Sequence, residues 1–349
     1  MTSLPATISH ELRDPLNLVR WLPTLLAIGL VLYAIVAGGY FVALAGFALI
    51  YAVFVTGLNI FMGLGGQASF GHNAFAAISG YTSAVLTTSY GWEMLPAMAV
   101  GVLGAVALAI LVGWPTLRLK GHYLAMATLA IGLIVYEIAV QWQSVTQGYT
   151  GISGIPPLGI GKWEAASDRA QLIVLSLIVM LAMFSAWRIR NSRFGRALVA
   201  FSGSEDAARA LGIDVARYKL AAFVVSAVYA AIAGSLLVHI VGFVSPEVFG
   251  MSLVIAGFTM LYVGGIGTVV GPFVGAIVIQ LLPETFRGLK EYQDIIYGAA
   301  LILILIYAPG GLASMSGLWR GGRSDGKTSD GETSGRGLAA AGKVAEVEP

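Results

Sequence analysis

The chain has 349 residues, of which 57% are hydrophobic and only 11% are charged. Because a soluble domain carries roughly 25% charged residues, this composition excludes a soluble enzyme, a nucleic-acid-binding domain and a disordered protein. The mean hydropathy of +0.83 indicates that the solvent of this protein is lipid, and the net charge of +2 implies no polyanionic partner such as a nucleic acid.

The N-terminal residues 1–20 are polar, and we expect them to form a cytoplasmic segment. The apolar run that follows is too long for the hydrophobic part of a cleaved signal peptide, so we expect an uncleaved first span. A spanning helix needs about 20 apolar residues. Runs near that length lie at 21–38, 41–62, 94–113, 123–142, 170–187, 219–241 and 249–267. Shorter apolar runs lie near 73–88, 270–283 and 293–308.

These runs predict an all-α fold, a polytopic transmembrane bundle of about eight to ten helices, with the lower count if two of the short runs do not cross. The membrane domain is expected over residues 21–316. Residues 317–349 are polar and have no apolar pattern, which predicts a disordered cytoplasmic tail.

The distribution of Lys and Arg predicts the orientation, because short cytoplasmic loops are enriched in these residues. With the N-terminus inside and every apolar run crossing, the outer loops hold only Lys162, Arg169, Arg287 and Lys290. The inner loops and ends hold Arg13, Arg20, Arg118, Lys120, Arg188, Arg190, Arg193, Arg196, Arg209, Arg217, Lys219, Arg320 and Arg323. We therefore expect both termini to be cytoplasmic.

The sequence contains no constellation that is typical of a catalytic or metal site. It has no cysteine, and its histidines show no metal-binding spacing, so we expect no metal and no cofactor. Residues Gly321–Thr328 fit the phosphate-loop pattern G-x-x-x-x-G-K-S/T. No strand precedes this stretch in the polar tail, and we interpret the match as chance.

The inner loop 188–218 contains a candidate helix for contact with a partner. Ser204 can cap a short helix whose first turn carries Glu205 and Asp206 near the positive end of the helix dipole. Gly212 is expected to end the helix in a left-handed conformation. Such a helix, with small Ala side chains facing outward, suits a groove on a partner protein; it can equally be a solvated connector between spans.

Polar residues inside the predicted spans either form hydrogen bonds between helices or line a wet path. The stretch Gly63–Asn73 is too polar and too rich in glycine for a lipid-facing helix, so we interpret it as a broken or re-entrant segment near the pathway. A carboxylate inside a span is costly unless it is paired or hydrated. The candidate residues of a translocation path are Gln67, Ser69, His72, Asn73 and Glu137.

The run Glu205–Ile213 resembles the E-A-A-x-x-x-G coupling signature of ABC-importer permeases, with Asp206 in place of its first alanine. The surrounding motifs narrow the resemblance to the permeases of branched-chain amino-acid ABC importers, the larger of the two permease types, over about residues 40–315. These motifs are Gly63–His72, Tyr81–Thr82, Ser192–Ala197, Arg217–Phe223, Gly242–Glu247 and Gly264–Pro272.

The resemblance implies a permease subunit in a bacterial inner membrane, which moves solute inward by alternating access and has no ATPase site of its own. Separate cytoplasmic ATP-binding subunits would grip the coupling residues, which are Glu205, Asp206, Ala207, Ala208 and Gly212. A second homologous permease would complete the pore, in contact with membrane lipid. A soluble periplasmic or extracellular solute-binding protein would deliver substrate to outer loops such as 143–169.

Two departures from the family pattern bear on the substrate. After Thr128–Ala130 the acid of the family is shifted to Glu137, and Gln147 replaces a glycine of an outer-loop motif. The expected substrates are branched-chain amino acids, with urea, short amides or aromatic acids as alternatives in the same importer class. An ion-coupled secondary transporter would need paired acids within the membrane, and a membrane-embedded enzyme would need clustered His, Asp or Glu. The predicted spans offer only Glu137.

Overall fold

The computed structural model describes residues 39–161, 163–165 and 167–285, and the isolated positions 298, 299, 302, 306, 311 and 312. The predicted N-terminal segment 1–20, the predicted first span 21–38 and the predicted tail 317–349 lie outside the described residues, as does most of the apolar run 293–308. The phosphate-loop match at Gly321–Thr328 lies outside them as well.

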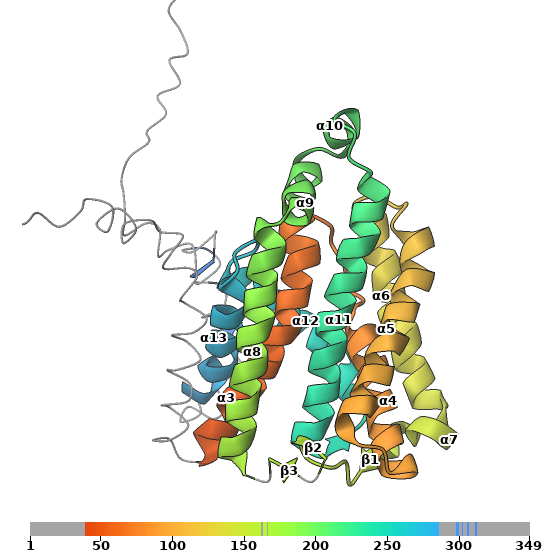
Figure 1. The fold of residues 1–349 in the computed structure, drawn as a ribbon, viewed down its shortest axis with the longest axis vertical. Helices are drawn as coiled ribbons and strands as arrows, with labels where there is room; N and C mark the ends of the chain where they lie inside the picture. The colour runs from red at the N-terminus through yellow and green to blue at the C-terminus, as the bar shows by residue number, and fades with distance from the viewer. Residues whose placement is uncertain are drawn as a thin grey trace, which may run out of the picture. The chain divides into compact units, whose positions relative to one another are not determined.

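The described chain is a bundle of helices (Figure 1). Its longer helices are α3 (Gly39–Leu58), α4 (His72–Tyr90), α5 (Met94–Thr116), α6 (His122–Gln141), α8 (Asp168–Asn191), α11 (Val215–Val241), α12 (Met251–Gly264) and α13 (Gly271–Thr285). The shorter helical elements are the π-helical η1 (Asn59–Leu64), α7 (Gln143–Thr146), η2 (Gly148–Thr150), α9 (Arg193–Gly203), α10 (Glu205–Ala210) and η3 (Pro246–Phe249).

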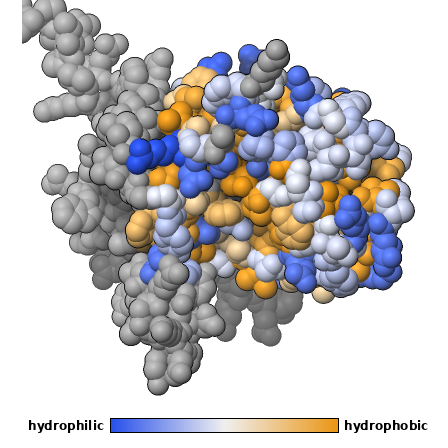
Figure 2. All heavy atoms as spheres, turned by 90° about the horizontal axis from the view of Figure 1, so that it is seen from below, coloured by the Kyte–Doolittle hydropathy of each residue, from blue (hydrophilic) through white to orange (hydrophobic). Residues whose placement is uncertain are grey.

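Two pairs of very short strands lie at one end of the bundle. Strand β1 (Ile152–Ser153) pairs antiparallel with β4 (Phe243–Val244), and β2 (Gly159–Ile160) pairs antiparallel with β3 (Trp163–Glu164). We call this end, with α7, the strand end, and the opposite end, with α9 and α10, the α10 end (Figure 1). Seen from the strand end, polar side chains are interspersed with apolar patches (Figure 2).

Six stretches among the described residues are long and apolar enough to cross a membrane: Gly39–Leu64, Met94–Thr116, His122–Gln141, Asp168–Asn191, Val215–Val241 and Pro246–Gly264. The all-α polytopic fold predicted from the sequence is therefore confirmed. Helices α4 and α13, which match the shorter apolar runs, are not among these stretches. The count of about eight to ten spans stays a prediction, because part of the chain lies outside the described residues.

Helix α11 lies inside the bundle and packs against α3, α4 and α5. It approaches α4 closely at Gly234, where a Cβ atom would lie 2.1 Å from the carbonyl oxygen of Ala76. Further along the same pair of helices, Ser83 and His239 form a hydrogen bond of 2.8 Å. Close approach at small residues and hydrogen bonds between helices hold a bundle together in lipid, where burying apolar surface against a neighbour gains little.

The chain between α3 and α4 is irregular, as predicted for Gly63–Asn73. Helix α3 continues into the π-helical η1, and residues 65–71, here called the linker segment, have no regular secondary structure before α4 begins. Figure 1 shows the linker segment running from the α10 end of the bundle to α4. The linker segment and α4 together return the chain to the strand end, so this stretch is a broken crossing and not a re-entrant hairpin.

The segment 188–218, expected as a loop with one short helix, is helical over most of its length. Helix α8 continues to Asn191, and α9 follows at once because Ser192 caps it by accepting a hydrogen bond of 3.2 Å from the N–H of Gly195. The apolar residues that α9 buries repeat at helical spacing, a pattern that predicts the helix. They are Ala197, Leu198 and Phe201.

Candidate functional site

Helix α10 has the local structure that its sequence predicts. The Ser204 hydroxyl caps it by accepting a hydrogen bond of 3.3 Å from the N–H of Ala207. Gly212 has a φ of 82°, the left-handed conformation expected at the end of the helix. Asp214 then caps α11 by accepting from the N–H of Arg217 at 3.2 Å. The two caps and the left-handed glycine each depend only on residues that are close in sequence. The turn from α9 through α10 to α11 is therefore determined by the local sequence.

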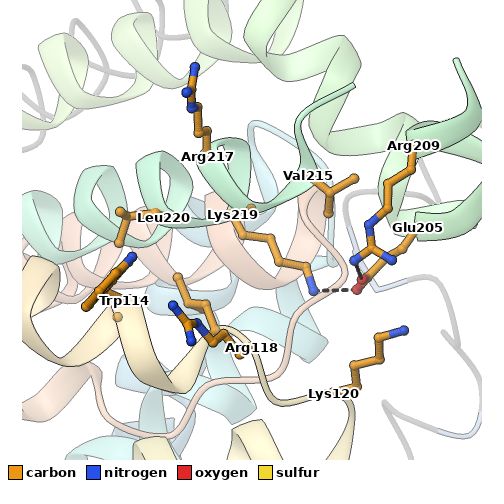
Figure 3. A pocket seen from close by; sticks show the side chains of 12 residues that line it. Trp114, Arg118, Lys120, Glu205, Arg209, Val215, Arg217, Lys219 and Leu220 are labelled. Carbon is orange, nitrogen blue, oxygen red and sulfur yellow. Dashed lines mark hydrogen bonds and ion pairs between the residues drawn. The ribbon is translucent and has the colours of Figure 1, made fainter. Parts of the chain in front are cut away.

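Glu205 points into the protein, in contrast to the expectation from the sequence that it faces a groove on a partner. Its side chain is 18% exposed and forms ion pairs with Arg209 at 3.2 Å and with Lys219 of α11 (Figure 3). Lys219 is 3% exposed. A buried ammonium group needs a paired charge, which explains why the first carboxylate of α10 turns inward.

The same carboxylate also contacts the linker segment. The side-chain amide of Gln67 donates a hydrogen bond of 3.4 Å to Oε1 of Glu205, the oxygen that Lys219 also contacts. Glu205 thereby connects three elements, α10, α11 and the linker segment.

The outward surface of α10 is formed by other residues. Asp206 has an 85% exposed side chain, Ala207 and Gly212 are exposed, and Leu211 is 81% exposed. Ala208 is buried, so the expectation that the Ala side chains all face outward is wrong for this one. The structure thus divides the predicted coupling residues into an outward group, Asp206, Ala207 and Gly212, and an inward group, Glu205 and Ala208.

A cationic groove of about 430 Å³ lies beside α10, between the end of α5 and the start of α11 (Figure 3). Its basic lining residues are Arg118, Lys120, Arg209, Arg217 and Lys219, and Glu205 is the acidic residue among those that line it in the described chain. The Arg118 guanidinium lies over the Trp114 ring, 5.0 Å from its centroid. The groove could not be predicted from the sequence, because residues of three separate elements line it.

Four of the predicted path residues follow one another along the linker segment and the start of α4. Gln67, Ser69, His72 and Asn73 are all buried. The two ring nitrogens of His72 form hydrogen bonds with Ser69 at 3.1 Å and with Ser226 of α11 at 2.9 Å. Both ring nitrogens are thus satisfied within the protein, so His72 holds the end of the linker segment against α11.

Glu137 lies apart from these four residues. It is on the exposed face of α6, where its carboxylate accepts a hydrogen bond of 2.8 Å from the side chain of Gln141. The structure therefore does not bring Glu137 together with the residues of the linker segment. It directly follows Tyr136, which lines a separate cavity together with Glu247.

An aromatic pair that could not be predicted from the sequence connects the linker segment with α12. The rings of Phe70, in the linker segment, and Phe258, in α12, are stacked with centroids 4.3 Å apart and planes inclined by 10°. Both line a narrow void together with Asn73 and Val254. The stack therefore lies beside Ser69, His72 and Asn73, which line the same void.

The sequence of this chain is similar to those of known transport proteins. The profile of the family described as "Branched-chain amino acid transport system / permease component" matches residues 40–305. The high-affinity branched-chain amino acid transport system permease protein LivM of Escherichia coli is 34% identical over 298 residues, which cover 79% of this chain and 70% of that protein. LivH, a permease protein of the same description from the same organism, is 28% identical over 286 residues, 75% of this chain and 90% of LivH.

A more distant relative is described as a permease protein of a sugar transport system. The xylose transport system permease protein XylH of Escherichia coli is 30% identical over 235 residues, which cover 64% of this chain and 55% of that protein. No solved structure matches the chain.

Proposed function

We propose that this chain, which belongs to the permease family of branched-chain amino acid transport systems, is the membrane-spanning subunit of an ATP-driven importer for branched-chain amino acids. It is a multi-pass membrane protein, and its relatives are permease subunits. The observation that carries the proposal is the family match over residues 40–305, which includes α10, the linker segment and all the candidate site residues.

Coupling to the ATPase takes place at the α10 end. The outward residues Asp206, Ala207 and Leu211 insert into a socket on a separate cytoplasmic ATP-binding subunit. Because basic side chains line the groove beside α10, we expect the facing surface of that subunit to be acidic. When ATP binding moves the socket, α10 moves with it, and Glu205 passes the displacement to Gln67 and Lys219.

The α10 end faces the cytoplasm of a bacterium, and the strand end faces the outside of its inner membrane. Of the described Lys and Arg residues, Arg169 alone lies at the strand end, and a basic excess is typical of the cytoplasmic side. A soluble solute-binding protein delivers its substrate to the strand end, where residues 143–169 lie. The orientation also places both termini in the cytoplasm if about ten segments cross.

A second homologous permease completes the pore. Large apolar side chains are exposed on the outer faces of the described helices, and membrane lipid together with the second permease covers them. Examples are Leu103 and Leu111 of α5, Ile134 of α6 and Ile255 of α12.

Reconstitution of the complete importer tests the proposal. Proteoliposomes with both permeases, the ATP-binding subunits and the cognate binding protein should take up labelled leucine, isoleucine and valine only when ATP is present. Uptake of urea, a short amide or an aromatic acid in preference to leucine would contradict the substrate. Uptake driven by an ion gradient without the ATP-binding subunits would contradict the class of transporter.

A further inference from the structure

The cationic groove at the α10 end has two unlike sides (Figure 3). On the side of α10 and α11, Arg209 and Arg217 both form ion pairs with nearby carboxylates. On the other side, Arg118 and Lys120 follow the end of α5, are exposed, and form no ion pair with the described residues. The α5 side of the groove therefore carries positive charge that the described chain does not neutralise.

Lys219 adds a buried cation to the wall of this groove. Its ammonium group contacts the carboxylate of Glu205, which also pairs with Arg209 at 3.2 Å, so two cations share one carboxylate. Among the described residues that line the groove, five are basic and one is acidic. The lining therefore attracts an anion.

An exposed, mostly apolar face of α5 leads along the helix to the groove. Leu103, Leu111 and Trp114 are each at least 67% exposed, and Ala107 is exposed as well. Spacings of three and four residues place these side chains in one row on the helix. Arg118 follows Trp114 by four residues, just past the end of α5. Because α5 is long and apolar enough to cross a membrane, this row runs from the acyl chains of the bilayer to its headgroups.

Trp114 and Arg118 form a pair that is typical of the membrane–water interface. The Arg118 guanidinium lies 5.0 Å from the centroid of the Trp114 ring (Figure 3). Tryptophan is enriched at the level of the lipid headgroups, and long basic side chains near helix ends extend to the same level. A guanidinium group matches the geometry of two phosphate oxygens, which indicates the kind of anion that this end of α5 suits.

From these features we propose that the groove binds the headgroup of an anionic phospholipid. The headgroup phosphate lies on Arg118 and Lys120, and an acyl chain lies along the exposed row of α5, on Leu111. The apolar row favours a lipid over an acidic protein surface, because such a surface would use only the cationic end of α5. The site goes beyond the proposed function and requires only that α5 crosses the membrane. It leaves Arg209 and Arg217, on the other side of the groove, to the proposed ATP-binding subunit.

Photolabelling of the full chain in phosphatidylcholine vesicles tests the site. A phosphatidylglycerol with a diazirine near its headgroup should label peptides that contain the end of α5. Unlabelled phosphatidylglycerol should compete with the label, whereas additional phosphatidylcholine, which has no net charge, should not. Inorganic phosphate and glycerophosphoglycerol, the headgroup without its acyl chains, should compete poorly, because neither can use the apolar row.

Substitutions of exposed residues test the roles of the two cations without disturbing buried packing. The double variant Arg118→Gln, Lys120→Gln should lower labelling on the order of tenfold, because it removes both cations that contact the phosphate. The matched control is Arg193→Gln, Arg196→Gln. It removes the same charge from exposed positions of α9 at the same end of the bundle, outside the groove, and labelling should be retained.

Three outcomes would overturn the lipid site. The first is equal labelling of the two double variants, or a label that attaches elsewhere in the chain. The second is competition by inorganic phosphate as effective as that by phosphatidylglycerol, which would make a free phosphate the ligand. The third is loss of co-purified ATP-binding subunits from Arg118→Gln, Lys120→Gln with unchanged labelling, which would assign these cations to the partner protein. The proposed function is decided separately, by leucine uptake in the reconstituted importer.

Discussion

Lys219, near the start of α11, and Glu205, the first residue of α10, form an ion pair between two helices. The ammonium group of Lys219 is buried, and the carboxylate of Glu205 compensates its positive charge. Because Glu205 also accepts a hydrogen bond from Gln67, one carboxylate links the proposed coupling helix to the linker segment. The chain therefore has a short mechanical route from the α10 end into the linker segment.

Replacing Lys219 by Met should weaken this route, because Lys219 helps to hold the carboxylate that Gln67 contacts. It leaves Glu205 without its buried partner, and we expect the free energy of unfolding to fall by about 1–3 kcal/mol. The assembled importer should still hydrolyse ATP but should take up less leucine for each ATP. The measurements are the ratio of uptake to hydrolysis in proteoliposomes and the thermal stability of the purified complex.

Two further variants separate a mechanical role of the ion pair from a stabilising one. Arg193→Met, which removes an exposed cation at the same end of the bundle, should leave both quantities unchanged. The double variant Lys219→Met, Glu205→Gln removes both charges and should recover most of the stability but not the coupling. If the double variant recovers coupling as well, the pair only stabilises the fold.

Gly212→Val tests the left-handed backbone conformation that follows α10. Gly212 has a φ of 82°, and no atom lies within 4 Å of the position that a Cβ would take, so any cost arises from the backbone. A β-branched residue in the left-handed region costs roughly 1–2 kcal/mol, and we expect α10 to change its direction instead of accepting this strain. Leucine uptake should fall while the amount of protein in the membrane stays normal.

The controls for Gly212 use the same chemistry. Gly203→Val adds the same side chain at a position that is equally open and has no positive φ, and uptake should be retained. Gly212→Asn should restore most of the uptake, because Asn tolerates the left-handed conformation. Equal loss of uptake in Gly203→Val and Gly212→Val would show that bulk, and not backbone conformation, is what matters.

The features that could be predicted from the sequence are those that a short stretch of neighbouring residues determines by itself. The cap at Ser204, the left-handed Gly212 and the irregular chain after Gly63 depend on neighbouring residues. The apolar runs predicted the membrane-crossing helices in the same way. Helix α9 also has a local signal, in its buried positions and in its capping residue Ser192.

The direction in which a side chain points depends on distant residues and could not be predicted. Glu205 turns inward because Lys219 is buried across from it, which is a property of how α10 lies on α11. Likewise, one cavity is lined by Asn73, Leu133 and Glu247, and only the packing of α4, α6 and η3 brings these residues together. Glu137 has the residue type of a path carboxylate, but its position on α6 places it on the exposed face.

We propose that the stack of Phe70 on Phe258, which lies beside predicted path residues such as Ser69 and Asn73, acts as a barrier to the solute. An aromatic pair contributes about 0.5–1.5 kcal/mol beyond the burial of its area, so Phe70→Ala should let the barrier open roughly two to ten times more often. We expect preloaded proteoliposomes to leak leucine without ATP. Phe184→Ala is the control, because the ring of Phe184 is exposed and its centroid lies 6.0 Å from that of Trp187. A tight membrane with Phe70→Ala would place the barrier elsewhere.

The orientation can be tested cleanly because the natural chain has no cysteine. Ser153→Cys places a single thiol on an exposed position of the strand end, and Ala200→Cys places one on the exposed face of α9 at the α10 end. A thiol reagent that cannot cross membranes should label position 153 in intact cells. It should label position 200 only after the membrane is permeabilised, because the basic α10 end is expected in the cytoplasm. Labelling of position 200 in intact cells would invert the orientation, and would put α10 out of reach of any cytoplasmic ATP-binding subunit.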